Sequence, residues 1–273
     1  MLTEFWWRYG CAIILKMTDI YQEIVRIRAE GEEAALATIV SATGSTPREE
    51  GTKMLVRADG SILGTIGGGS LEAQVIEEAI KVIEQGKPKR LHTSMTAKEV
   101  EEKGMLCGGE VEVFIEPILT PPTLYIFGGG HISLSLARMG KLLGFKIAVI
   151  DDRAEFANAD RFPEADTILA EDFSRAFPKL KIDKSSYIVI VTRNHQYDDM
   201  VLEWAVGTKA KYIGMIGSKT KTKAVFTHLM TKGIAKEKLA RVHAPIGLEI
   251  NAQTPEEIAV SILAEIIMAR RSP

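Results

Sequence analysis

Glycines, a serine and an acid are spaced in residues 123–152 as in a site for a phosphate-bearing ligand. Gly128, Gly130 and Ser133 meet the spacing G-x-G-x-x-S, and Asp151 follows at about the 20-residue interval that is typical of dinucleotide-binding turns. Glycine lets the backbone approach a pyrophosphate, and the free N–H groups at a helix start attract the anion. We therefore expect a phosphate or pyrophosphate to bind at this turn.

Gly129 and His131 complete the expected turn. His131 stands where the turn becomes a helix, so we expect its imidazole to face the bound anion. A helix start disfavours an imidazolium and a phosphate restores it, so the charge of His131 stays open. The alternatives are that His131 only caps the turn, and that the glycines form a tight turn without a ligand.

Polar residues also follow other expected strands of the same region. Ligands of open parallel sheets gather outside the carboxyl ends of the strands, where these loops converge. Asp151 could accept from a ribose hydroxyl there, and Arg153 supplies a cation nearby. Each loop residue alone is more commonly solvated, but their convergence on one edge favours a joint site. The other candidate cofactor-binding residues in these loops are Thr192, Arg193, His195, Ser218 and Lys219.

The first half of the chain carries two further candidates. The run Gly67, Gly68 and Gly69 precedes a helical pattern, which predicts either a second anion-accepting helix start or a plain turn. Cys107 stands in MLCGGE just before a strand pattern. It is either a soft ligand for molybdenum or sulfur chemistry or a small buried residue.

The element pattern changes at Pro121-Pro122, which cannot lie inside a central strand or helix. Upstream, residues 17–120 predict a small α/β or α+β domain with a hairpin around Ala58-Asp59-Gly60. Thr96 and Glu99 form a capping-box pattern before a short helix. The predicted strands are 34–41, 53–57, 61–66 and 110–116, and a helix is predicted over 70–85.

Residues 121–273 alternate between strand and helix patterns, which predicts a doubly wound parallel sheet of the Rossmann-like type. Thr254 and Pro255 begin the last helix. Its broad apolar face packs either on the sheet or on a partner subunit. The predicted strands are 123–127, 145–150, 167–170, 187–192 and 211–216.

Composition bounds the class of protein. The chain has 273 residues, of which 46% are hydrophobic, and its net charge of −2 argues against a nucleic-acid partner. Cys11 and Cys107 imply no disulfide framework, so we expect a reducing, cytoplasmic location. No apolar run approaches the ~20 residues that span a bilayer, so we expect no membrane partner. Signatures of hydrolases, zinc sites and Walker loops are absent from the sequence, which therefore predicts binding more clearly than catalysis.

Residues 1–16 lack a basic region and a cleavage site, so a signal peptide is not expected. We interpret them either as the product of an upstream start codon, with Met17 as the natural start, or as a hydrophobic arm that packs on a neighbouring subunit.

Taken together, these segments resemble the XdhC/CoxI family of accessory proteins for molybdenum hydroxylases such as xanthine dehydrogenase. The resemblance runs from Met17 to near the end of the chain. One segment, TRNHQYDD, departs at Asn194, where the family tends to carry glycine. The matching segments include SATGSTPREEGTKMLV, DGSILGTIGGGSLEAQV, CGGEVEVFIEP, FGGGHIS, VIDDR, GMIGSK and APIGLEINAQTPEEIAVSILAEI.

The resemblance implies a chaperone and not a metabolic enzyme. Such a protein binds the molybdenum cofactor, as molybdopterin or its cytosine dinucleotide form, while a cysteine desulfurase sulfurates the molybdenum. It then helps to insert the cofactor into an apo molybdenum hydroxylase of the xanthine dehydrogenase type, and it is generally a homodimer. The alternatives are an NAD(P)-dependent oxidoreductase, in which His131 or His195 would serve as proton donor, and a nucleotide-sensing regulatory module.

Overall fold

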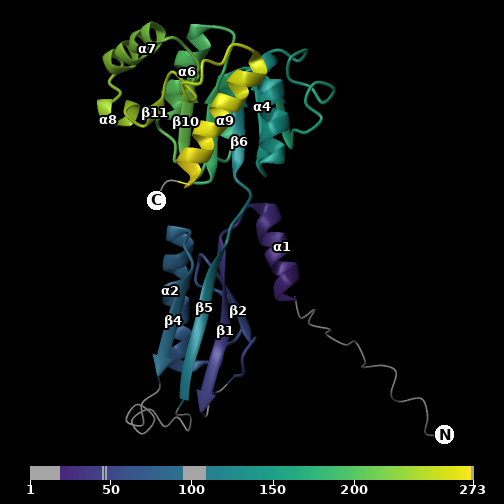
Figure 1. The fold of residues 1–273 in the computed structure, drawn as a ribbon, viewed down its shortest axis with the longest axis vertical. Helices are drawn as coiled ribbons and strands as arrows, with labels where there is room; N and C mark the ends of the chain where they lie inside the picture. The colour runs from purple at the N-terminus through teal and green to yellow at the C-terminus, as the bar shows by residue number, and fades with distance from the viewer. Residues whose placement is uncertain (1–18, 45, 47, 95–108, 272–273) are drawn as a thin grey trace, which may run out of the picture. The chain divides into compact units, whose positions relative to one another are not determined.

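The computed structural model describes residues 19–44, 46, 48–94 and 109–271. The chain divides into two compact units, Met1–Thr120 and Pro121–Pro273 (Figure 1). Three predictions fall outside the described residues, namely the leader 1–16, the role of Cys107 and the short helix after Thr96. Within the described ranges, no helix is both long enough and apolar enough to cross a membrane.

The N-terminal unit contains β1 (Ala34–Gly44), β2 (Lys53–Arg57), β3 (Ile62–Gly64), β4 (Lys89–Ser94) and β5 (Gly109–Ile118). They form one antiparallel sheet in the order β3-β2-β1-β5-β4. The predicted hairpin is confirmed, because Gly60 turns with a φ of 82° and Asp59 Oδ1 accepts from the Ser61 N–H at 2.9 Å. The sequence did not predict β4, since KRLHTS is a polar strand at the sheet edge and lacks an apolar pattern.

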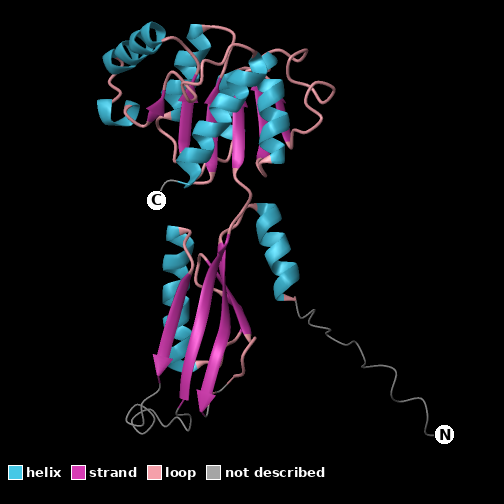
Figure 2. Cartoon of the chain, viewed as in Figure 1, coloured by secondary structure: helices cyan, strands magenta, loops and turns pink. Residues whose placement is uncertain are grey.

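Helices α1 (Ile20–Glu30) and α2 (Gly69–Gln85) cover opposite faces of this sheet (Figure 2). Val75 of α2 packs among the buried side chains of β1, β2 and β5. Ile27 of α1 packs on the other face, against Leu55 of β2. Alternate side chains along each strand therefore support two small cores.

A buried carboxylate ties α1 to the sheet. Glu23 Oε1 accepts from Arg26 Nη2 and from Arg57 Nη2, each at 2.9 Å. Hydrogen bonds from these two guanidinium groups lower the pKa of Glu23 from 4.5 to about 2. The ionised form is therefore favoured in the folded unit and less so in the unfolded chain.

We expect the stability of this unit to depend on the charge of Glu23. A carboxyl group with a depressed pKa stabilises the fold fully above its unfolded pKa of 4.5, and the contribution disappears as the pH falls towards about 2. Glu23→Gln should therefore weaken hydrogen-exchange protection of α1 at neutral pH, and the difference from wild type should shrink below pH 4.5. Glu30→Gln, which removes an exposed partner of Arg26, is the matched control. An equal loss at every pH would contradict this role for Glu23.

The C-terminal unit contains β6 (Thr123–Phe127), β7 (Lys146–Asp151), β8 (Thr167–Ala170), β9 (Ser186–Ile190), β10 (Tyr212–Met215) and β11 (Val242–His243). All are parallel, in the order β11-β10-β9-β6-β7-β8. From the centre of the sheet, β6, β7 and β8 follow one another towards one edge, and β9, β10 and β11 follow one another towards the other edge. This is the strand order of the Rossmann fold, with its switch point between β6 and β9. The predicted fold class is confirmed.

Helices cover both faces of the parallel sheet (Figure 1). Leu124 and Ile126 of β6 point into the core with α4 and α9, while Tyr125 and Phe127 point into the core with α5, α6 and α7. The helices are α4 (His131–Leu142), α5 (Phe173–Ala176), α6 (His195–Ala205), α7 (Lys219–Thr231), α8 (Lys236–Leu239) and α9 (Pro255–Arg271).

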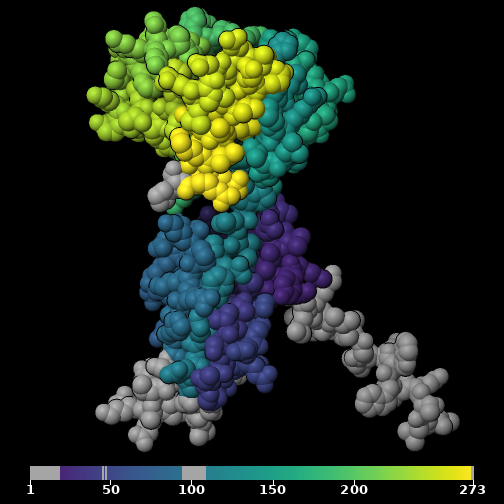
Figure 3. All heavy atoms as spheres, in the orientation of Figure 1, coloured from purple at the N-terminus to yellow at the C-terminus, as the bar shows by residue number. Residues whose placement is uncertain are grey.

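The last helix begins as predicted and packs on the sheet. Thr254 Oγ1 accepts from the Glu257 N–H at 3.2 Å, and Glu257 Oε2 accepts from the Thr254 N–H at 3.1 Å, which is a capping box. In the space-filling view α9 lies at the surface beside α4 (Figure 3). Its outer side leaves Val260, Ile267 and Met268 exposed.

Candidate phosphate-binding site

The three glycines between β6 and α4 have different surroundings. A Cβ on Gly128, whose φ is 111°, would lie 2.4 Å from the Val191 carbonyl oxygen, and one on Gly129 would lie 2.4 Å from that of Phe156. A Cβ on Gly130 would have no heavy atom within 4 Å. The first two glycines are therefore required by packing, and the third borders open space.

The open glycine stands at an uncapped helix start. Gly130 is the N-cap of α4 with a φ of −74°, and no side chain caps this helix. The first N–H groups of a helix have no partner within the helix and carry its positive dipole end. His131, the first residue of α4, is exposed beside them. The arrangement can accept an anion at the position where the sequence predicts one.

Ser133 closes the turn from inside. It is fully buried, and its hydroxyl donates to the Gly128 carbonyl at 2.6 Å. The third fingerprint position normally holds a small residue so that the helix can pack closely on the strand. Ser133 meets that requirement and holds the turn in place through this hydrogen bond. Because it is buried, we assign it a structural role and not a contact with the ligand.

Asp151 is the last residue of β7, and both of its carboxylate oxygens already accept hydrogen bonds within the protein. Oδ1 accepts from the Arg153 N–H at 3.0 Å and from Arg153 Nε at 2.9 Å. Oδ2 accepts from the Gly129 N–H at 2.8 Å and from Arg153 Nη2 at 3.1 Å. Burial alone would raise the pKa of Asp151, but the bonds from Arg153 and Gly129 outweigh it and lower the pKa. The predicted ribose acceptor is thus an ionised carboxylate whose lone pairs already have donors.

The segment after Arg153 contributes two residues that the sequence reasoning missed. Phe156 lies under the Arg153 guanidinium, 3.6 Å from ring centroid to Cζ. Arg161 Nη2 donates to the Gly129 carbonyl at 3.1 Å, and its Nε is buried with no partner in the described structure. Both residues stand in an irregular loop without a motif, so neither periodicity nor spacing singles them out.

The loop after β9 is organised by a buried acid. Asp198 is fully buried, and its Oδ1 accepts from the Thr192 hydroxyl at 2.6 Å. Its Oδ2 accepts from Lys221 Nζ at 2.5 Å. Asn194 caps α6 by accepting from the Tyr197 N–H at 3.0 Å, with a φ of −148° that needs no glycine. The departure at Asn194 therefore leaves the loop geometry unstrained, and Thr192 serves the loop itself.

Arg193 joins this loop to the one after β7. Its Nη2 donates to Asp152 Oδ2 at 2.7 Å and approaches the Tyr197 hydroxyl at 3.1 Å. The Tyr197 hydroxyl also donates to Asp152 Oδ2, at 3.1 Å. His195 is exposed at the start of α6. The glycine turn, Asp151, Arg153 and Arg193 thus lie on connected loops at one edge of the sheet.

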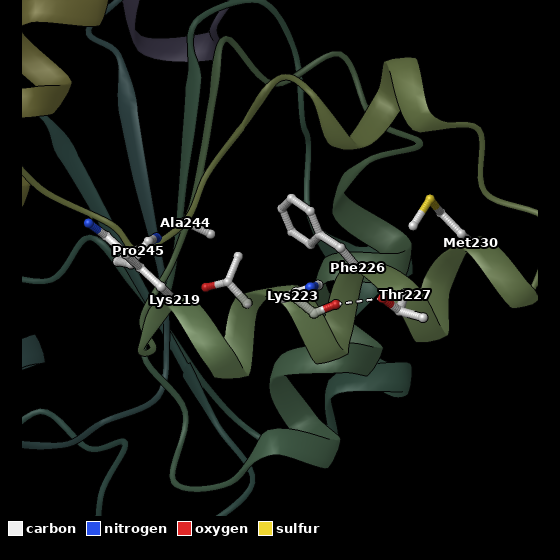
Figure 4. Close-up of a pocket in the computed structure, with 8 residues that line it drawn as sticks. Lys219, Lys223, Phe226, Thr227, Met230, Ala244 and Pro245 are labelled. Atoms are coloured by element: carbon white, nitrogen blue, oxygen red, sulfur yellow. Dashed lines mark hydrogen bonds between the residues drawn. The ribbon is translucent and has the colours of Figure 1, made fainter.

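The remaining predicted residues of this unit lie at the start of α7. Ser218 caps the helix by accepting from the Lys221 N–H at 3.1 Å. Lys219 is largely exposed and pairs with Glu249 at 3.1 Å. Lys219 also borders a separate hollow of 380 Å³ between α7 and the segment after β11 (Figure 4). The hollow is lined by Lys219, Thr222, Lys223, Phe226, Thr227, Met230, Ala244 and Pro245.

In the N-terminal unit the chain supplies its own anion to the glycine run. Gly67, Gly68 and Gly69 all have positive φ angles, of 128°, 76° and 64°. Glu72 Oε2 accepts from the Gly68 N–H at 3.2 Å and from the Thr65 hydroxyl at 2.6 Å. The carboxylate therefore binds the N–H of the N-cap residue of α2, whereas no side chain caps the first turn of the helix itself.

Comparisons with known proteins match both units. Residues 124–266 match the model of the XdhC Rossmann domain, and residues 27–94 match the model of the XdhC and CoxI family. A crystal structure of a xanthine dehydrogenase from Bacillus halodurans has a similar fold, with a TM-score of 0.50 and 23% identity. The match covers 92% of this chain and 95% of the Bacillus halodurans chain.

Three curated relatives are similar in sequence. Uncharacterized protein YqeB of Escherichia coli is 39% identical over 255 residues, which are 93% of this chain and 47% of YqeB. A probable xanthine dehydrogenase subunit of Bacillus subtilis is 31% identical over 58% of this chain and 46% of its own length. The chain therefore spans about half the length of these two relatives. The molybdenum cofactor insertion chaperone PaoD of E. coli is 24% identical over 93% of this chain and 90% of PaoD.

Proposed function

Because the chain belongs to the XdhC and CoxI family, we propose that it is an accessory protein that binds the molybdenum cofactor and helps insert it into a molybdenum hydroxylase of the xanthine dehydrogenase type. The observation that carries the proposal is the open, uncapped helix start at Gly130. A pterin cofactor ends in a phosphate, and such a helix start accepts phosphate oxygens. The relative named as a cofactor insertion chaperone supports the same assignment.

The phosphate would be held by backbone and by cations already in place. No side chain caps the first N–H groups of α4, and a Cβ on Gly130 would meet no heavy atom within 4 Å. Arg161 is anchored on the Gly129 carbonyl through its Nη2, which places its positive charge next to the turn. His131 adds a ring beside the same anion. These groups bind and orient the cargo, and none of them needs to act as a catalyst.

The remaining features of the family belong to the same proposal. The cofactor is held while a cysteine desulfurase sulfurates its molybdenum, and Cys107 is a candidate soft ligand during that step. The protein acts in the cytoplasm as a homodimer. The exposed Val260, Ile267 and Met268 of α9 offer an apolar surface for a second copy of the chain.

An NAD(P)-dependent oxidoreductase or a nucleotide sensor would use the same glycine turn. Both need an acceptor for the ribose of the nucleotide. The predicted acceptor, Asp151, is paired with Arg153 and Gly129 in this structure. The geometry therefore supports the chaperone over either alternative.

Reconstitution of an apo-hydroxylase tests the proposal. Apo-enzyme of the xanthine dehydrogenase type is mixed anaerobically with sulfurated cofactor, either free or first loaded on this chain. We expect the loaded chain to restore activity faster and to a higher final level than free cofactor does. Equal activation by free cofactor and by the loaded chain would contradict the chaperone function.

A further inference from the structure

The neighbourhood of the glycine turn bears on which class of phosphate ester can bind. In dinucleotide-binding folds the acid about 20 residues after the fingerprint accepts from a ribose hydroxyl. By position this acid is Asp151, the last residue of β7. A carboxylate has about four lone-pair sites, and the four N–H donors of Arg153 and Gly129 take them. A ribose would have to displace one of these donors.

Displacing Arg153 is unfavourable on two counts. Its guanidinium is held between the Asp151 carboxylate and the ring of Phe156, 3.6 Å from the ring centroid. The Asp151 side chain is only 3% exposed, so removing its cation would leave a buried charge unpaired. A hydroxyl of ribose is a neutral donor and replaces a charge-assisted hydrogen bond poorly.

A second set of contacts spans the end of β6. In the sheet β6 lies between β7 and β9. Asp152 follows β7 and Arg193 follows β9, and their side chains meet at 2.7 Å with the Tyr197 hydroxyl 3.1 Å from both. We call Asp152, Arg193 and Tyr197 the bridge. The bridge joins the loops on either side of the glycine turn. Within it, Asp152 Oδ2 accepts from Arg193 and Tyr197, so this acid is also engaged and is not free to accept from a ribose in place of Asp151.

We propose that Arg153 and the bridge exclude nucleosides from the glycine-turn site, so that it selects a terminal phosphate monoester over a dinucleotide. What stays open is the space beside Gly130 at the start of α4, where a phosphate needs only backbone N–H groups. The exclusion of nucleosides from this site does not depend on which cofactor the protein carries. Its extension, that the cargo is molybdopterin and not the cytosine dinucleotide form, rests on the proposed function.

The test compares ligands that differ in the nucleoside. Wild-type protein is titrated anaerobically with molybdopterin cofactor, with its cytosine dinucleotide form, and with NADH. We expect the monoester form to bind at least about tenfold more tightly than the dinucleotide form, and NADH to bind weakly. Equal affinity for the two pterin forms, or tight binding of NADH, would overturn the proposal. Binding of neither pterin form would instead contradict the proposed function, while the NADH titration still decides the exclusion of nucleosides.

Variants then test which residues exclude the nucleoside. Arg153→Ala with Arg193→Ala removes the arginine donors from both acids, so NADH affinity should rise by about tenfold or more. Arg138→Ala with Arg175→Ala, two exposed arginines outside the site, removes the same charge and should leave NADH binding unchanged. The milder pair Arg193→Gln with Tyr197→Phe keeps Arg153 on Asp151 and should give a smaller gain. Folded variants with no gain in either pair would overturn the assignment to these residues.

Discussion

Replacing Gly130 by aspartate should abolish retention of the molybdenum cofactor and leave the C-terminal unit folded. A Cβ at this position meets no heavy atom within 4 Å, and the φ of −74° suits any L-residue. Aspartate is also a better N-cap than glycine, so α4 should be as stable as before or slightly more stable. The new carboxylate takes the N–H groups that would hold the phosphate and repels it. We expect an affinity loss of about 100-fold or more.

The measurement is cofactor retained after gel filtration, read as pterin fluorescence after oxidation. Ala235→Asp is the matched control, because Ala235 is the N-cap of α8 and has no side-chain cap. It adds the same charge and the same capping group to a different helix, so retention should equal that of wild type. Normal retention by Gly130→Asp would show that the glycine turn is not the site.

Replacing the neighbouring Gly129 by alanine should instead strongly destabilise the C-terminal unit. The added Cβ would lie 2.4 Å from the carbonyl oxygen of Phe156 and 2.9 Å from its carbonyl carbon. Both are backbone atoms, so no flexible side chain can move aside. We expect a loss of about 3 kcal/mol or more in the free energy of unfolding, at or above the upper range for overpacking.

Urea unfolding followed by tryptophan fluorescence measures this loss. Trp204 stacks on Phe177, with ring centroids 4.4 Å apart, and reports on the C-terminal unit once Trp6 and Trp7 are replaced by phenylalanine. Gly130→Ala is the control, because the same methyl group enters open space one residue later. If both variants unfold at the same urea concentration, the packing assigned to Gly129 is incorrect.

The elements around the glycine turn could be predicted because local rules determine them. A buried strand, a glycine turn and an amphipathic helix leave a pattern within about 30 residues, which is the length of one βαβ unit. The hairpin at Asp59-Gly60 and the capping box at Thr254 are local in the same way. The edge strand β4 was missed because a polar strand at a sheet edge carries no such pattern.

The state of the site residues could not be predicted because tertiary contacts determine it. Spacing places Asp151 correctly at the end of β7, but says nothing of the Arg153 side chain that folds back onto it. The contact between Asp152 and Arg193 joins residues 41 positions apart, and Arg161 reaches Gly129 across 32. The sequence therefore indicates which loops meet, whereas the pairing of charges within them requires the structure.

The most direct test of the central claim is cofactor binding by the wild-type chain. Molybdenum cofactor released anaerobically from a donor enzyme is added to the purified protein, and bound pterin is measured after gel filtration. The account predicts retention of about one pterin per chain, competed by excess inorganic phosphate because the phosphate group is the anchor. No retained pterin at cofactor concentrations well above those of the protein would contradict the account.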